Sequence, residues 1–168
     1  GGDAGGVFVT AGTLRVIGNG FDNTFISSDT LGAGNAGEVR ITAKSLSIEQ
    51  AGFISSDTYT GGNAGDISIK SDTISLKDFG NIRSRTLSEG TAGDIEISTG
   101  TLTLMSGGTI SSEATEMSFG DAGFVGISAD TLTVGPTTLI STARQGGGDA
   151  GRIGVTVKTL NLDGGDIR

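Results

Sequence analysis

The sequence lacks several residue types on which much protein chemistry depends. None of its 168 residues is Cys, His or Trp, and only one is Pro. Without Cys there can be no disulfide bond and no thiolate metal site. Without His the chain lacks the commonest transition-metal ligand and the usual general base. The sequence therefore indicates no catalytic, cofactor-binding or metal-ligating residue, and no cofactor.

Positive charge is also scarce. Eleven Lys and Arg residues stand against 19 Asp and Glu, so the net charge is −8. A nucleic-acid-binding protein needs a basic stripe, and this chain has none, so nucleic acid is excluded as a partner. No stretch is long and apolar enough to span a membrane, and no signal pattern opens the sequence, so we expect no membrane insertion.

Glycine, in contrast, is abundant, with 31 residues. Each Gly inside a helix costs about 1 kcal/mol relative to Ala, so this composition disfavours helices. Branched residues and Thr, which suit strands, fill the intervals between the glycines, which suit turns. The composition predicts an all-β protein.

A short motif recurs along the chain, Ala-Gly-x-(Val/Ile)-x-(Ile/Val). Its anchor glycines are Gly5, Gly37, Gly65, Gly93, Gly123 and Gly151. A second apolar pair follows each anchor, beginning at Leu14, Leu46, Ile74, Leu102, Leu132 and Leu160. A third apolar block follows, centred on Ile26, Ile54, Ile82, Ile110, Ile140 and Ile167. Repeats of this length indicate a solenoid.

Apolar and polar residues alternate within all three runs of each repeat, which is typical of strands with one buried face. The sequence therefore predicts a parallel β-helix (β-solenoid) with three strands per coil and about six coils of about 28 residues, forming one segment over 1–168. Surplus residues beginning at Gly18 and around 116–120 are expected in turns. A leucine-rich repeat, a nine-residue calcium-binding roll and a β-sandwich fit the period or the pattern less well.

The alternation also assigns faces. Val39, Ile67 and Ile95 are expected to stack inward on adjacent coils. A hydroxyl column should follow the third strand inward, where each hydroxyl must bond along the stack or to a turn carbonyl. Its members are Ser28, Ser56, Ser84, Ser112 and Thr142.

Polar residues precede each Ala-Gly anchor, and two interpretations stay open for them. They are Asp3, Asn35, Asn63, Thr91, Asp121 and Asp149. Such side chains can bond nearby turn backbone, and stacked carboxylates can alternatively bind calcium, with Asp121 and Asp149 as ligands. Because three members carry no charge, we favour turn capping.

The alternation also predicts two outward columns. Asp29, Asp57, Arg85 and Glu113 should form one, in which Arg85 relieves acid repulsion as a surface ion pair. A hydroxyl ladder on the second strand forms the other, and β-propensity explains it better than ice binding. Its members are Thr13, Ser45, Thr73, Thr101, Thr131 and Thr159.

The segments 62–69 and 54–58 carry a resemblance to a known family. Gly-Asn-Ala-Gly-Asp-Ile-Ser-Ile and Ile-Ser-Ser-Asp-Thr resemble repeats of filamentous-haemagglutinin-like exoproteins, of the cyanobacterial type in particular. This resemblance implies a right-handed β-helix, two-partner secretion and a role in adhesion or cell-surface structure.

We therefore expect a structural or adhesive stalk segment of a secreted or cell-surface protein, extracellular and without catalysis. Its expected partners are cell-surface or extracellular-matrix components, including polysaccharide, and neighbouring coils or other copies meeting it end to end. One alternative is a solenoid that binds polysaccharide or calcium, and a second is a β-helix carbohydrate-active enzyme. Because the chain begins inside its own repeat and offers no end caps, we expect it to be part of a longer protein.

Overall fold

The computed structural model describes residues 2–19, 22–115, 119–144 and 148–168 and contains twelve strands and no helix among them. The odd-numbered strands are long: β1 Val7–Ile17, β3 Val39–Glu49, β5 Ile67–Leu76, β7 Ile95–Leu104, β9 Val125–Val134 and β11 Ile153–Leu162. The even-numbered strands are shorter: β2 Thr24–Ser27, β4 Gly52–Thr58, β6 Asn81–Thr86, β8 Thr109–Ala114, β10 Leu139–Arg144 and β12 Asp166–Ile167.

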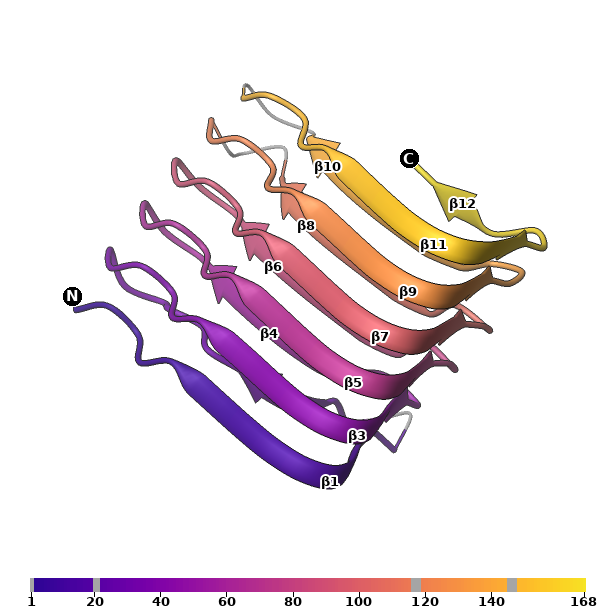
Figure 1. The fold of residues 1–168 in the computed structure, drawn as a ribbon. Helices are drawn as coiled ribbons and strands as arrows, with labels where there is room; N and C mark the ends of the chain where they lie inside the picture. The colour runs from indigo at the N-terminus through magenta and orange to yellow at the C-terminus, as the bar shows by residue number, and fades with distance from the viewer. Residues whose placement is uncertain (1, 20–21, 116–118, 145–147) are drawn as a thin grey trace.

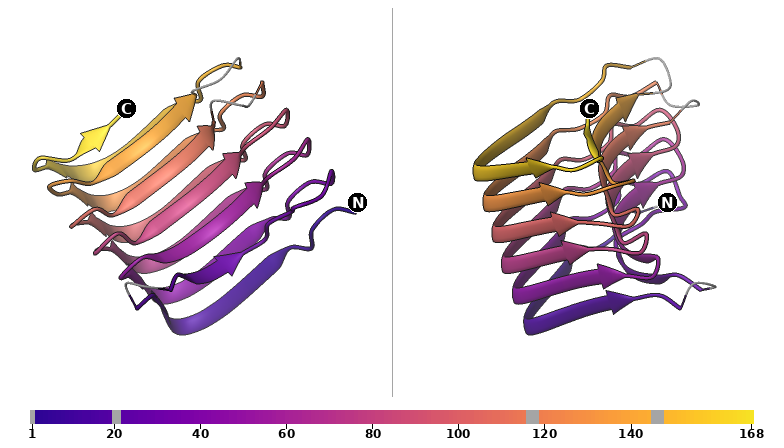
Figure 2. Two further views of the ribbon diagram at one scale, coloured as in Figure 1. Left: turned by 180° about the vertical axis from the view of Figure 1, so that it is seen from behind. Right: turned by 90° about the vertical axis from the view of Figure 1, so that its right-hand side faces the viewer.

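These strands form a parallel β-solenoid, which confirms the predicted fold. The odd-numbered strands make one six-stranded sheet in chain order, and the even-numbered strands make the other. Figures 1 and 2 show the coils stacked in sequence, with β1 and β11 at opposite ends of the column. Ile67 pairs with Val39 on one side and with Ile95 on the other, as the repeat predicts.

The expected third sheet is absent from the described residues. The first and second predicted strands of each repeat are one long strand, which bends midway (Figure 1). In the pairing of β3 with β5, the matched residues run to Ala43 and resume at Ser45, so Lys44 is left out. The chain thus turns this corner within one extended strand, where the sequence predicts two separate strands.

The core fills the space between the two sheets. Val39, Ile67, Ile95 and Val125 form an inward stack on the long strands, and each is at most 1% exposed. Ile54, Ile82, Ile110 and Ile140 face them from the short strands, and all are fully buried. The alternation of the sequence therefore assigns the buried faces correctly.

The described residues that flank the two predicted insertions lie between strands, as expected. Residues 20–21 and 116–118 of these insertions are outside the described residues.

Candidate functional site

Polar side chains at the turns join each coil to the next one. The Oδ1 atom of Asp3 accepts the N–H of Asn35 at 2.7 Å, and Oδ1 of Asn35 accepts the N–H of Asn63 at 2.9 Å. Oδ1 of Asp121 accepts the N–H of Asp149 at 2.6 Å. Turn capping is therefore confirmed, with the bonds running between coils.

A second, shorter ladder of the same kind lies three residues further along the turns at Asp66 and Asp94, and the sequence pattern was not used to predict it. Oδ1 of Asp66 accepts the N–H of Asp94 at 2.8 Å, and Oδ1 of Asp94 accepts the N–H of Phe124 at 2.7 Å. The recurrence of an acid directly after the anchor glycine in Asp66 and Asp94 was the available signal.

The inward serine column fastens the anchor turns. The hydroxyl of Ser84 accepts the N–H of Gly93, the next anchor glycine, at 2.9 Å and donates to the carbonyl of Gly65, the preceding anchor glycine, at 3.1 Å. Ser56 makes the same pair of bonds with Gly65 and Gly37. The predicted bonding of the inward hydroxyls to turn carbonyls is confirmed for Ser28, Ser56, Ser84 and Ser112, which makes these serines structural.

Replacing Ser84 with Ala is therefore expected to lower the free energy of unfolding by about 1–3 kcal/mol, because a buried N–H and a carbonyl lose their partner. Thr73→Ala, on the exposed outer face, should change it by no more than about 0.5 kcal/mol. Urea titration of both variants measures the difference. Equal losses of stability in the two variants would mean that the hydrogen bonds of Ser84 do not stabilise the fold.

The outward acidic column contains a buried charge network. Oδ2 of Asp57 lies 2.8 Å from Nη2 of Arg83 and 3.1 Å from Nη2 of Arg85. The Asp57 side chain is only 1% exposed, so the predicted surface ion pair is wrong: this pair is buried. The Arg83 guanidinium also lies 4.9 Å from the centre of the Phe53 ring, which is stacked on Phe25.

Burial raises the pKa of the Asp57 carboxyl group above its ordinary value, while the charges of Arg83 and Arg85 act in the opposite direction. Its second oxygen, Oδ1, has no hydrogen-bond partner among the described residues. The acid is covered by the side chains of Arg83 and Arg85, which are themselves mostly buried.

The outer face of the long strands carries a hollow. It has a volume of about 410 Å³, and its floor crosses β5, β7, β9 and β11. Two rows of paired residues on adjacent strands border it, one that includes Glu96 and one that includes Ser98. Smaller hollows of about 310 and 290 Å³ continue the depression beyond Ser98, which borders all three.

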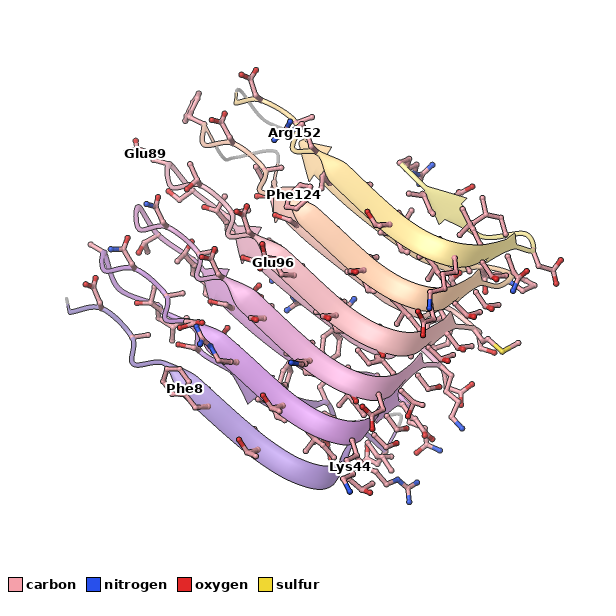
Figure 3. All side chains as sticks on the ribbon, viewed as in Figure 1. Phe8, Lys44, Glu89, Glu96, Phe124 and Arg152 are labelled. Carbon is pink, nitrogen blue, oxygen red and sulfur yellow. The ribbon has the colours of Figure 1, made fainter. Side chains whose placement is uncertain are left out.

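The hollow exists because two consecutive coils lack a side chain in one row. Along this row, pairing joins Ser68, Glu96, Gly126 and Gly154. The Phe124 ring lies over both glycines, since a Cβ atom added at Gly126 or Gly154 would be 2.6 or 2.9 Å from it. Figure 3 shows Phe124 between Glu96 and Arg152 near the beginnings of their strands.

No group of three or more Asp or Glu side chains in the described part of the chain gathers as a metal site would. The described ranges also contain no helix with the length and apolar character needed to cross a membrane.

Comparison with protein-family models, with curated proteins and with solved structures gives no match. The likeness to filamentous-haemagglutinin-like repeats thus remains a prediction from the residues quoted for it.

Proposed function

We propose that this chain is a stalk segment of a secreted or outer-surface protein, with a structural and adhesive role and no catalysis. The observation that carries the proposal is the bonding between coils. Beside the backbone ladders, side-chain oxygens of the turns accept N–H groups of the following coil, as Asn35 does from Asn63. This bonding recurs along the column and strengthens it along its axis, which is the direction in which a stalk bears force.

The buried hydroxyls support the same proposal. Four serines, Ser28, Ser56, Ser84 and Ser112, each tie two successive anchor glycines together, as Ser84 does with Gly65 and Gly93. The polar residues of the turns and of the core are thus used to hold neighbouring coils together. In filamentous-haemagglutinin-like proteins, which these repeats resemble, such a column would extend from the cell surface and present its outer faces to polysaccharide or matrix.

Pulling the chain by its two ends tests the load-bearing role. Because the hydrogen bonds of the ladders run along the column, we expect coils to detach one after another. Each coil of 28 residues should release about 90–100 Å of chain, at about 3.3–3.6 Å per residue. Single-molecule force spectroscopy measures these steps. A smooth extension like that of an unfolded chain, without resolved steps, would contradict the stalk.

A further inference from the structure

The hollow beside Phe124 combines three departures from the repeat at one place. The position directly after the anchor glycine is polar in most coils, being Glu38, Asp66, Asp94 and Arg152, but is aromatic at Phe124. Gly126 lies two positions after Phe124, and Gly154 pairs with it in the next coil. These two glycines leave the outward row of Ser68 and Glu96 without side chains. Neither glycine lies at a turn, since β9 and β11 contain them.

The glycines do not serve close packing of the backbone. At Gly126 and Gly154, the atoms nearest to an added Cβ belong to the Phe124 ring, in contrast to the anchor Gly93, where they belong to the backbone of the adjacent coil. The ring is therefore what the two glycines accommodate. The Phe124 backbone is held by the N–H bond to Asp94, so the start of its side chain is fixed.

The other outward side chains around the hollow are polar and balanced in charge, whereas the isoleucines of its lining are buried in the core. Ser98, Ser128 and Thr156 succeed one another in one row of adjacent strands and are exposed. Lys70 and Glu96 contribute one charge of each sign. An aromatic ring surrounded by hydroxyls, with no net charge, fits a neutral ligand that has apolar faces and many hydroxyl groups.

We propose that this hollow binds a neutral polysaccharide chain, with one sugar ring on the face of Phe124. The chain would run along the column, because the hydroxyl row repeats at each strand, about 4.8 Å apart. The two smaller hollows that share Ser98 extend the depression beside this row. The inference rests on the proposed adhesive function and names the class of surface component that it would contact.

The glycan chemistry is favoured over a basic peptide. The acidic turn residues Asp66 and Asp94 already accept backbone N–H groups, and Lys70 borders the hollow together with Glu96. A cationic ligand would meet this lysine, whereas a neutral chain of sugars meets hydroxyl groups.

Titration of the full chain with neutral hexasaccharides tests the proposal, using cellohexaose, xylohexaose, mannohexaose and chitohexaose, with binding followed by NMR shifts and calorimetry. At least one should bind. Phe124→Ala should weaken that binding by about fivefold or more, since one aromatic contact is lost. Gly154→Ala should weaken it too, because the added Cβ displaces the ring without touching backbone.

Phe8→Ala is the matched control. Phe8 is an exposed aromatic residue in the same outward row, on β1, and does not border the hollow. Its loss should leave binding unchanged. The proposal is overturned if none of the four sugars binds, if Phe124→Ala and Phe8→Ala have the same effect, or if only polylysine binds. None of these results alters the force steps, so the stalk and the glycan site fail separately.

Discussion

Replacing Gly93 with Ala is expected to lower the free energy of unfolding by at least about 4 kcal/mol, among the largest effects of a single substitution. A Cβ atom at this anchor would lie 2.3 Å from the carbonyl oxygen of Gly65 and 2.5 Å from its carbon. Both are backbone atoms of the adjacent coil, and the ladders on either side hold them in place. The coils would have to separate, which breaks the bonds around the turn.

Gly61→Ala provides the control for this prediction. An added Cβ at Gly61 would have no atom within 4 Å, and its backbone is not in the left-handed region. Its stability should therefore change by no more than about 0.5–1 kcal/mol. Urea unfolding followed by circular dichroism compares the two variants. Equal effects would show that the anchor glycine is not needed for close approach of the coils.

The second large effect is expected in the middle of the core. Leu102 is fully buried and pairs with Ile74 on one side and Leu132 on the other. Leu102→Ala should cost about 2–5 kcal/mol, because the lost contacts leave a cavity between two coils that cannot close freely.

Thr101→Ala, one residue away, should cost less than about 1 kcal/mol, since this side chain points outward and is exposed. Chemical denaturation of the two variants gives the comparison. If both lost the same stability, the assignment of inward and outward faces would be wrong.

Much of the fold could be predicted from the period and the alternation of the sequence. The anchors place Ile67 between Val39 and Ile95, and this pairing is observed. The role of the serine column could also be predicted, because a buried hydroxyl needs partners and the turns offer them. These conclusions depend only on which residues repeat and at what distance.

The number of sheets could not be predicted in this way. The sequence predicts separate strands for the first two apolar runs of each repeat, and the inward residues Ala43 and Leu46, where these runs meet, are three positions apart. The backbone instead stays extended through Lys44, with one residue left out of the pairing. Whether a break in the pattern is a loop or a bend depends on backbone angles that the side-chain pattern does not record.

The buried charge of Asp57 was missed for a related reason. Alternation places this residue outward, and outward was equated with exposed. Arg83 stands opposite Ser55 in the register, two positions from the partner of Asp57, and its long side chain reaches diagonally to cover the acid. Aligning the repeats shows which residues are direct neighbours on adjacent strands, but it does not show such diagonal contacts.

The hollow could have been found from the sequence. Gly126 and Gly154 stand where earlier coils have Ser68 and Glu96, and Phe124 stands where they have acids. All three positions depart from the repeat, and the predicted register makes them neighbours. Together they could therefore have been predicted as one candidate site. What the structure adds is the place of the ring over both glycines.

The register of the column is the central claim, and distances between spin labels test it most directly. The chain has no Cys, so labels can be attached to cysteines introduced at chosen sites. Thr13 and Thr159 occupy one outward row and are five strands apart, whereas Thr73 and Thr159 are three strands apart.

At about 4.8 Å per strand, the Thr13–Thr159 pair should be about 24 Å apart and the Thr73–Thr159 pair about 14 Å. The difference of about 10 Å between the pairs is independent of the length of the label. Electron paramagnetic resonance on the two doubly labelled variants measures it. A separation that grows by one strand spacing per repeat is the predicted result, and a Thr13–Thr159 distance no longer than the Thr73–Thr159 distance would contradict the solenoid.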